Sequence, residues 1–366
     1  KPVEAFVVVS ETTRESRFAA RQSGTLTPIV GRDREIELIF ERWALALSGQ
    51  GQMIIVGGEA GIGKSRITKA VIDGIAQNDH RRMTYQCSPY HADSAFYPLI
   101  QQLSFITGFT STDSLDTRLD KMETLFGKDN DTLKLVVAMM GLDGTKRYGE
   151  LGLTPTQQRA QTMQALARLL VRQAKEKPVL VVYEDLHWID PTSLELLDLL
   201  LDSIADQPIM ILATARPTFE HGFGGHPIVT RFALNRLGKD QIGAIALKMT
   251  DGKVLPDEIM QIIVERTDGV PLFIEELTKT ILESGALKKD GERLVLNGPL
   301  STIAIPTTLH DSLMARLDRL QPIKDVAQMA SCIGRDFSHG LLSQISLLPD
   351  AKLRTALDVL IDAELD

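Results

Sequence analysis

One segment constrains the fold of this chain more than any other: an apolar run, Met53 to Val56, leads directly into a glycine-rich stretch and then into a helical pattern. The glycines let the backbone curl so that several N–H groups point inward toward a phosphate. The helix that begins near Lys64 adds the positive end of its dipole. Because the stretch reads Gly-x-x-x-x-Gly-Lys-Ser between a strand and a helix, it predicts a phosphate-binding loop for a nucleoside triphosphate.

Two residues of this loop have distinct predicted roles. The Lys64 ammonium can reach the β- and γ-phosphates, and the Ser65 hydroxyl can ligate Mg²⁺. The residues predicted to contact the nucleotide are Gly58, Glu59, Ala60, Gly61, Ile62, Gly63, Lys64, Ser65 and Arg66.

The composition is that of an ordinary soluble globular protein, with 43% hydrophobic and 24% charged residues among 366. This length allows about two or three domains. The net charge of −8 argues against broad binding to nucleic acid. The two cysteines, Cys87 and Cys332, make no disulfide framework, and the longest apolar runs are too short to span a bilayer. We therefore expect a cytoplasmic protein that does not bind membranes.

Strands and helices alternate in the first two thirds of the chain. Strands are expected at about 52–57, 82–87, 178–183 and 208–214, with a weaker one near 231–234. Helical patterns are expected at roughly 33–48, 64–76, 94–107, 156–176 and 191–204. Because these strands are apolar on both faces, the pattern predicts an α/β fold with a parallel five-stranded sheet flanked by helices.

The pattern changes after about residue 236, where short helices follow one another. They are expected at about 238–248, 257–268, 272–285, 306–319, 322–333 and 351–363. Residues 288–298 form a polar, glycine-marked break that fits either a loop or a hairpin.

The third expected strand ends in two adjacent carboxylates, Glu184 and Asp185. An enzyme with a phosphate-binding loop needs acidic groups on a neighbouring strand, to hold Mg²⁺ and to polarise the attacking water. Neighbouring positions on a strand point in opposite directions, so the two residues can share one role only if the strand has already ended. We favour Glu184 for Mg²⁺ and Asp185 for the water, and the reverse assignment stays open.

Other polar residues lie near the same predicted edge of the sheet. Arg216 follows the fourth expected strand, at the end where open α/β sheets bind ligands. His187 and Trp188 fit a packed loop, with His187 beside the γ-phosphate as the alternative. Asp190 before Pro191 predicts a helix start.

Together these motifs resemble the STAND class of P-loop ATPases (signal-transduction ATPases with numerous domains), which are relatives of the AAA+ proteins. Gly58 to Ser65 matches the Walker A motif of that class, and Val179 to Asp185 matches Walker B. Thr214-Ala215-Arg216 resembles its sensor strand, whose arginine reads the γ-phosphate. The resemblance also includes an opening motif beside the adenine pocket and a proline motif against the base, here Ile29, Val30, Gly31 and Arg32, and Gly269 and Pro271.

The sequence Glu184-Asp-Leu-His-Trp-Ile-Asp-Pro191 is similar to the corresponding segment of bacterial multidomain adenylate/guanylate-cyclase-type proteins. That group implies covalently linked effector and sensor domains outside this chain. LuxR-type large regulators carry the same ATPase region. The expected division is a linker at 1–24, a nucleotide-binding domain at 25–236, a helical lid at 237–300 and an incomplete winged-helix-like domain at 301–366.

The resemblance implies an ATP/ADP- and Mg²⁺-dependent signalling switch, for which a homo-oligomer stays open. Lys64, Glu184, Asp185 and Arg216 would be its catalytic residues. Many family members carry Asp where this chain has Glu184, and the longer side chain shifts the geometry, so we expect slow hydrolysis.

One alternative function is that of a DNA-binding AAA+ initiator, which the acidic C-terminal region disfavours. Another is a phosphotransferase that uses His91, Asp93 or His187.

Overall fold

The computed structural model describes residues 28–298 and 323–362, apart from positions 111, 128, 292, 334–338 and 347. These residues form two compact units. The sheet unit holds Arg32–Ala60 and Lys64–Leu234, and the helical unit holds residues 28–31, Gly61–Gly63 and the described residues from Asn235 onward. The predicted linker at 1–24 and the predicted helix at 306–319 lie outside the described residues.

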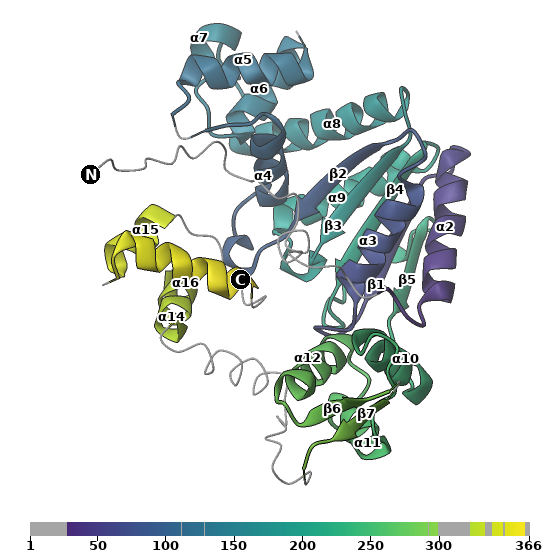
Figure 1. The fold of residues 1–366 in the computed structure, drawn as a ribbon. Coiled ribbons are helices and arrows are strands. Elements are labelled where there is room, and N and C mark those ends of the chain that lie inside the picture. The colour runs from purple at the N-terminus through teal and green to yellow at the C-terminus, as the bar shows by residue number, and fades with distance from the viewer. Residues whose placement is uncertain are drawn as a thin grey trace. The chain divides into compact units, whose positions relative to one another are not determined.

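The sheet unit is built on five strands (Figure 1). They are β1 (Gln52–Gly57), β2 (Arg81–Gln86), β3 (Val179–Glu184), β4 (Ile209–Ala215) and β5 (Val229–Ala233). The strand order is β2-β3-β4-β1-β5, and every neighbouring pair is parallel. The predicted α/β fold with a parallel five-stranded sheet is therefore confirmed. All five carboxyl ends lie at one edge of the sheet.

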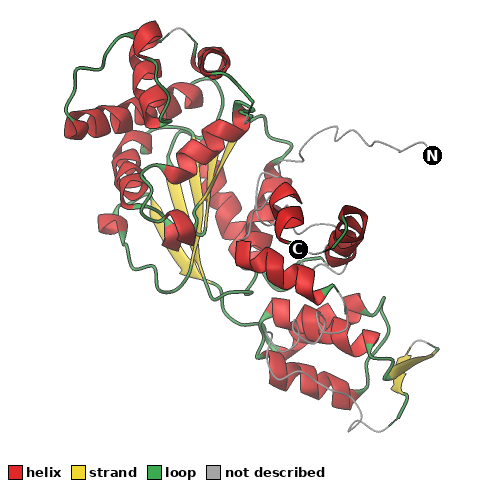
Figure 2. Cartoon of the chain, turned by 90° about the vertical axis from the view of Figure 1, so that its left-hand side faces the viewer, coloured by secondary structure: helices red, strands yellow, loops and turns green. Residues whose placement is uncertain are grey.

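Helices cover both faces of this sheet (Figure 2). The helices packed against the sheet are α2 (Asp33–Leu47), α3 (Lys64–Ile75), α4 (Tyr97–Ile106), α8 (Pro155–Ala174) and α9 (Pro191–Ile204). β1, β3 and β4 are buried at every position, because neither face of these strands meets water. This double burial explains why their sequences are continuous apolar runs.

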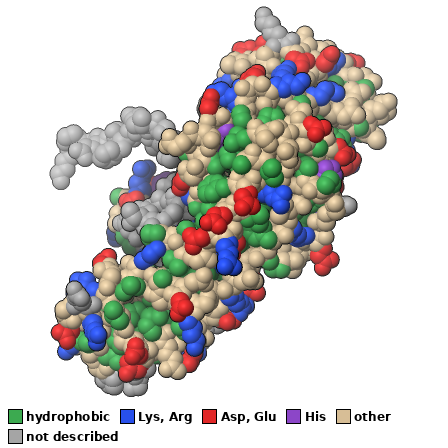
Figure 3. Space-filling view, turned by 90° about the vertical axis from the view of Figure 1, so that its right-hand side faces the viewer, with side chains coloured by type: hydrophobic (Ala, Val, Ile, Leu, Met, Phe, Trp, Pro, Cys, Tyr) green, Lys and Arg blue, Asp and Glu red, His purple; other side chains and the backbone are tan. Residues whose placement is uncertain are grey.

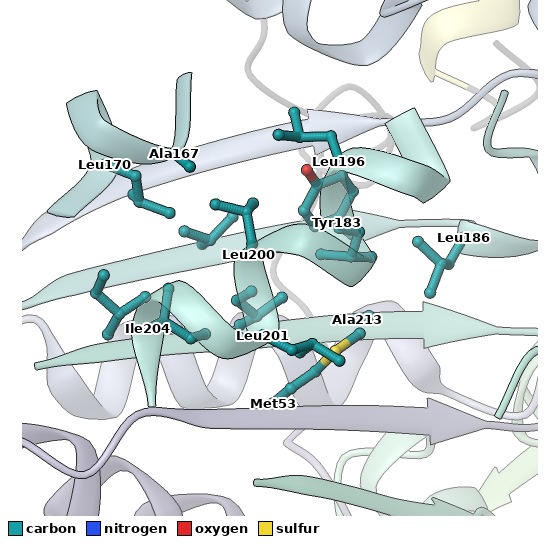
Figure 4. Close-up of a cluster of buried hydrophobic side chains, with 14 of the residues drawn as sticks. Met53, Ala167, Leu170, Tyr183, Leu186, Leu196, Leu200, Leu201, Ile204 and Ala213 are labelled. Atoms are coloured by element: carbon teal, nitrogen blue, oxygen red, sulfur yellow. The ribbon is translucent and has the colours of Figure 1, made fainter. Parts of the chain in front are cut away.

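Alternate residues of β3 and β4 face one side and pack against α8 and α9. Val181 belongs to this cluster. So do Tyr183 of β3, Ala213 of β4, Leu200 of α9 and Leu170 of α8, which Figure 4 labels. Since successive strand residues point to opposite faces, the even-numbered residues of β3 and β4 face the other side of the sheet. That parity determines where the site residues at the strand ends point.

Between β2 and β3 the chain adds a small helical layer that the sequence did not predict. It consists of α5 (Leu115–Phe126), α6 (Asn130–Met139) and α7 (Thr145–Tyr148), and a short helix, η1 (Pro89–His91), precedes α4. Met122 of α5 and Val136 of α6 are fully buried, in one cluster with Leu169 of α8. A second short helix, η3 (Phe223–Gly225), precedes β5.

The helical unit contains α10 (Lys239–Met249), α11 (Asp257–Thr267) and α12 (Pro271–Glu283) around one apolar cluster. The break predicted as a loop or a hairpin is a hairpin of β6 (Leu287–Asp290) and β7 (Arg293–Leu296). A separate cluster joins α14 (Lys324–Ile333), α15 (His339–Ile345) and α16 (Asp350–Asp362). The assignment of 301–366 as winged-helix-like stays a prediction.

No helix among the described residues combines the length and apolar character that crossing a membrane requires.

Candidate functional site

The glycine-rich loop connects β1 to α3 at the carboxyl edge of the sheet. Its first residue is tied to β4, since the Gly58 N–H donates to the Ala215 carbonyl over 3.1 Å. Gly61 has φ +76° and Gly63 has φ +102°, conformations that L side chains rarely adopt. A Cβ at Gly63 would meet nothing within 4 Å, so only the backbone conformation requires glycine there.

Gly61 is constrained twice, because its surroundings are crowded as well. A Cβ at this position would lie 3.1 Å from Leu272 Cβ and 3.3 Å from Val270 Cγ1. The Leu272 N–H, in the first turn of α12, donates to the Gly61 carbonyl over 3.2 Å. Gly61–Gly63 belong to the helical unit. The loop tip and the start of α12 are thus in direct contact within that unit.

Lys64, the first residue of α3, folds back over the loop. Its Nζ donates to the carbonyls of Gly58 and Glu59, each over 2.9 Å. Partial burial is the main cause that lowers the pKa of Lys64; the charge of Asp185 raises it and that of Arg216 lowers it further. Three of the predicted catalytic residues, Lys64, Asp185 and Arg216, therefore lie close enough for their charges to interact.

The two carboxylates at the end of β3 differ in their surroundings. Glu184 is the last strand residue and is 8% exposed. Its even position places its side chain on the face opposite to Tyr183, away from α8 and α9. Asp185 lies beyond the strand with φ 57° and ψ 47°, a left-handed conformation. The strand has therefore ended at Asp185, and strict alternation does not apply to it.

A hydrogen bond joins the ends of β3 and β4. The Asp185 N–H donates to Thr214 Oγ1 over 3.0 Å, and Thr214 is 2% exposed. Thr214 is absent from the predicted site residues. Its signal was a polar side chain in the apolar strand β4, but the partner of that side chain depends on the strand order, which the sequence does not show.

Arg216 follows β4 directly and is exposed. Its Cζ lies 5.1 Å from the ring centroid of Trp188, which ends the short helix η2 (Leu186–Trp188). Trp188 is partly buried against the main core cluster, as the packed-loop interpretation expects. Asp190 caps α9 as predicted, accepting the Ser193 N–H over 2.9 Å.

Each residue of the opening motif, Ile29–Arg32, has its own contacts or degree of burial. Arg32 is 5% exposed and its Nη1 donates to Glu35 Oε1 over 3.2 Å. The Gly31 carbonyl accepts from Gln241 Nε2 over 3.4 Å, and Val30 packs against the apolar cluster of the helical unit. The remaining residue of the opening motif, Ile29, is half-buried.

Gly269 is held close to the backbone of Leu237. The Leu237 N–H donates to the Gly269 carbonyl over 2.9 Å, and a Cβ at Gly269 would lie 2.3 Å from the Leu237 carbonyl oxygen. Pro271 is the first residue of α12, as the local turn predicts. The motif therefore fixes the start of the helix whose next residue, Leu272, contacts Gly61.

The side chains suited to Mg²⁺ are the hydroxyl of Ser65 and the two carboxylates. Ser65 and Arg66 are half-buried in the first turn of α3, while Glu59 and Ala60 are exposed and Ile62 is buried. Among the described residues, no three His, Cys, Asp or Glu side chains come together as a metal-binding group. The donor set fits a magnesium ion that takes few protein ligands and is completed by phosphate oxygens and water.

A cavity of about 600 Å³ lies elsewhere, between α8 and α9. Its lining includes Arg168, Arg172, Lys175 and Leu199. The last turns of α8 and α9 lead into the starts of β3 and β4, so this cavity belongs to the amino-terminal edge of the sheet. It is not part of the site at the phosphate-binding loop.

Comparison with known proteins gives one family match over half of the chain. A model of the AAA ATPase domain family matches residues 28–212. An uncharacterized protein of Rhizobium meliloti (strain 1021) is 28% identical over 331 residues, which cover 88% of this chain and 31% of that protein. The chain therefore spans about a third of the length of this curated relative.

Two solved structures have a similar course of the chain. The ORC1 protein of Aeropyrum pernix, in complex with DNA, aligns with a TM-score of 0.46 and 11% identity over 93% of this chain and 85% of that chain. A STAND protein with a tetratricopeptide repeat sensor from Pyrococcus horikoshii aligns with a TM-score of 0.43 and 13% identity over 84% of this chain and 36% of that chain.

Proposed function

The chain belongs to the AAA ATPase domain family, and we propose that it is an ATP- and Mg²⁺-dependent switch module of a larger signalling protein. Membership in an ATPase family implies nucleotide binding. The observation that carries the proposal is the charge cluster at the carboxyl edge of the sheet, where Lys64, Asp185 and Arg216 interact electrostatically. Two cations and one carboxylate beside a phosphate-binding loop suit a triphosphate.

In this proposal the loop from Gly58 to Arg66 binds the phosphates. Lys64 leaves the carbonyls of Gly58 and Glu59 and donates to the phosphate oxygens instead, which provide stronger, charged acceptors. Arg216 would add a second positive charge at the terminal phosphate. Ile29–Arg32 and the segment from Gly269 to Pro271 would contact the base, as the resemblance to STAND proteins implies.

Mg²⁺ would be held by Ser65 and Glu184. The parity of β3 supports this role for Glu184, since its side chain lies on the face away from α8 and α9. Bound Mg²⁺ would neutralise charge on the phosphates. Asp185 would orient and deprotonate the attacking water, and its electrostatic interaction with Lys64 supports a place near the terminal phosphate. Hydrolysis would be slow and would reset the switch.

The contact between Gly61 and Leu272 supports a switch rather than a purely metabolic enzyme. A nucleotide that moves the loop tip would act on the first turn of α12 through this hydrogen bond. In many nucleotide switches, the γ-phosphate determines the order and the position of the segments that contact it. The attached effector would be a nucleotide cyclase or a transcription-regulatory domain, and the module would form a homo-oligomer.

Solution scattering tests the switch. We expect different profiles with ADP–Mg²⁺ and with a non-hydrolysable ATP analogue–Mg²⁺, at concentrations that saturate the site. Identical profiles would contradict the switch. The protein would then be a nucleotide-binding domain whose conformation does not depend on the nucleotide. Sedimentation under the same two conditions separates a change of shape from a change of oligomeric state.

The composition gives no support to the alternative of a DNA-binding initiator. The net charge of the chain is −8, and on the face shown in Figure 3 positive and negative side chains are interspersed. Non-specific affinity for DNA depends on neutralising several phosphates with Lys and Arg. We expect no salt-dependent shift of duplex DNA in a gel.

A further inference from the structure

Trp188 and Arg216 form a contact that no motif of the sequence predicts. Trp188 follows β3 and Arg216 follows β4, and the guanidinium carbon lies 5.1 Å from the centre of the Trp188 ring. At this distance the cation is attracted by the π face of the ring. The contact therefore ties the exposed arginine to a residue at the end of the neighbouring strand.

Backbone hydrogen bonds and packing against the core restrain the segment that carries Trp188. The Trp188 N–H donates to the Asp185 carbonyl over 2.9 Å, and the Ile189 N–H donates to the Leu186 carbonyl over 3.1 Å. Leu186 is fully buried, and Trp188 itself packs against the main core cluster (Figure 4 labels Leu186). A partner held in this way can restrict a long, exposed side chain that otherwise samples many rotamers.

Charge explains why Arg216 needs such a partner. Arg216 lies close enough to Lys64 to oppose its protonation, so the two cations repel each other. Repulsion between like charges favours conformations in which the exposed arginine turns into solvent. The cation–π contact with the ring of Trp188 offers a compensating attraction.

We propose that Trp188 is a positioning residue that holds the Arg216 guanidinium beside Lys64 for the terminal phosphate of a nucleoside triphosphate. The preference of the protein for a triphosphate over a diphosphate then depends on Trp188, although Trp188 does not contact the phosphates. This inference rests on the proposed nucleotide-binding function.

Calorimetry with ADP–Mg²⁺ and with a non-hydrolysable ATP analogue–Mg²⁺ tests the proposal. We expect Trp188→Leu to weaken the triphosphate analogue about two- to fivefold while ADP affinity stays unchanged, since only the triphosphate needs the positioned arginine. Trp188→Phe, which keeps a π face, should retain most of the discrimination. Arg216→Gln should lose it, and adding Trp188→Leu to Arg216→Gln should cost nothing more.

The chain also allows a readout that does not depend on affinity. Trp43 and Trp188 are its two tryptophans, so Trp43→Phe leaves Trp188 as the single emitter. We expect its emission to change with the triphosphate analogue more than with ADP, and this difference to vanish when Arg216→Gln is added. Equal responses to both nucleotides would contradict the proposal.

The two possible failures can be told apart. If the wild-type protein binds neither nucleotide, the proposed function is wrong and the inference falls with it. If it binds both and Trp188→Leu and Trp188→Phe keep the wild-type ratio of affinities, the nucleotide site stands and only the role of Trp188 is overturned. A thermal melt of each variant confirms that it is folded before titration.

Discussion

The backbone N–H of Asp185 donates a 3.0 Å hydrogen bond to the hydroxyl of Thr214, so the residue that ends the acidic strand is fastened to the neighbouring strand. Asp185 has a left-handed backbone, which is unusual for a residue other than glycine. The hydrogen bond that the Asp185 N–H donates to Thr214 stabilises this conformation and with it the direction of the carboxylate. The geometry of the proposed site therefore depends on a residue that is not among the predicted nucleotide, metal or catalytic residues.

Replacing Thr214 should loosen this connection. Thr214→Val keeps the shape of the side chain but removes the hydroxyl that accepts from the Asp185 N–H. We expect a loss of about 1–2 kcal/mol in the free energy of unfolding, measured in urea. Thr214→Ser retains the hydroxyl and is the matched control. Equal stability of the valine and serine variants would show that the hydrogen bond does not matter.

The glycines of the loop offer a matched pair of substitutions. Gly61→Ala introduces a strained conformation and a close contact with Leu272, whereas Gly63→Ala introduces strain alone. We expect each to cost about 1–2 kcal/mol from the backbone, with a larger loss for Gly61→Ala. Urea unfolding measures both. A smaller loss for Gly61→Ala than for Gly63→Ala would contradict the close approach of α12.

The partial burial of Lys64 predicts a dependence of stability on pH. Its pKa is lowered from the ordinary 10.5, so above the lowered value the folded protein binds fewer protons at this site than the unfolded chain does. The wild type should therefore gain stability relative to Lys64→Met as the pH rises through the window between the lowered pKa and 10.5. Urea unfolding of both proteins at pH 7 and pH 10 measures the gain. An unchanged difference would mean that the Lys64 pKa is not lowered.

Substitutions of Glu184 and Asp185 should affect different steps, Mg²⁺ binding and hydrolysis. We expect Asp185→Asn to keep ATP affinity within about twofold and to slow single-turnover hydrolysis by about 10²–10⁴-fold, the usual contribution of a general base. Glu184→Gln should instead reduce the gain in ATP affinity that Mg²⁺ provides, measured by calorimetry with Mg²⁺ and with EDTA. Asp73→Asn, an exposed carboxylate paired with Lys69 on α3, is the control.

If Asp185→Asn abolishes the effect of Mg²⁺ and Glu184→Gln abolishes hydrolysis alone, the two roles are reversed. The alternative that the sequence left open would then be the right one.

The sheet could be predicted because its strands are buried on both faces. β1, β3 and β4 appear in the sequence as short apolar runs next to turn signals, and the structure places them within one residue of the expected positions. The start of β5 was predicted two residues too late and its end one residue too late, since its edge position leaves it half exposed and less apolar. The helices α5 and α7 were missed because their sequences are rich in polar residues, and α6 because its apolar run is short.

The site was predictable only in its local parts. The loop from Gly58 to Ser65 and the pair Glu184 and Asp185 have signals of their own in the sequence. The contacts of Thr214 with Asp185 and of Trp188 with Arg216 depend on β3 and β4 being neighbours, which follows from the strand order alone. The contact of Gly61 with Leu272 joins residues more than two hundred positions apart, and no local pattern marks it.

Calorimetric titration of ATP–Mg²⁺ into the wild type and Lys64→Ala tests the central claim most directly. We expect the wild type to bind at a ratio of about one, and the variant to lose at least about tenfold in affinity because it lacks the charged donor to the phosphates. Equal binding by the two proteins would contradict the assignment of the site to the loop from Gly58 to Ser65.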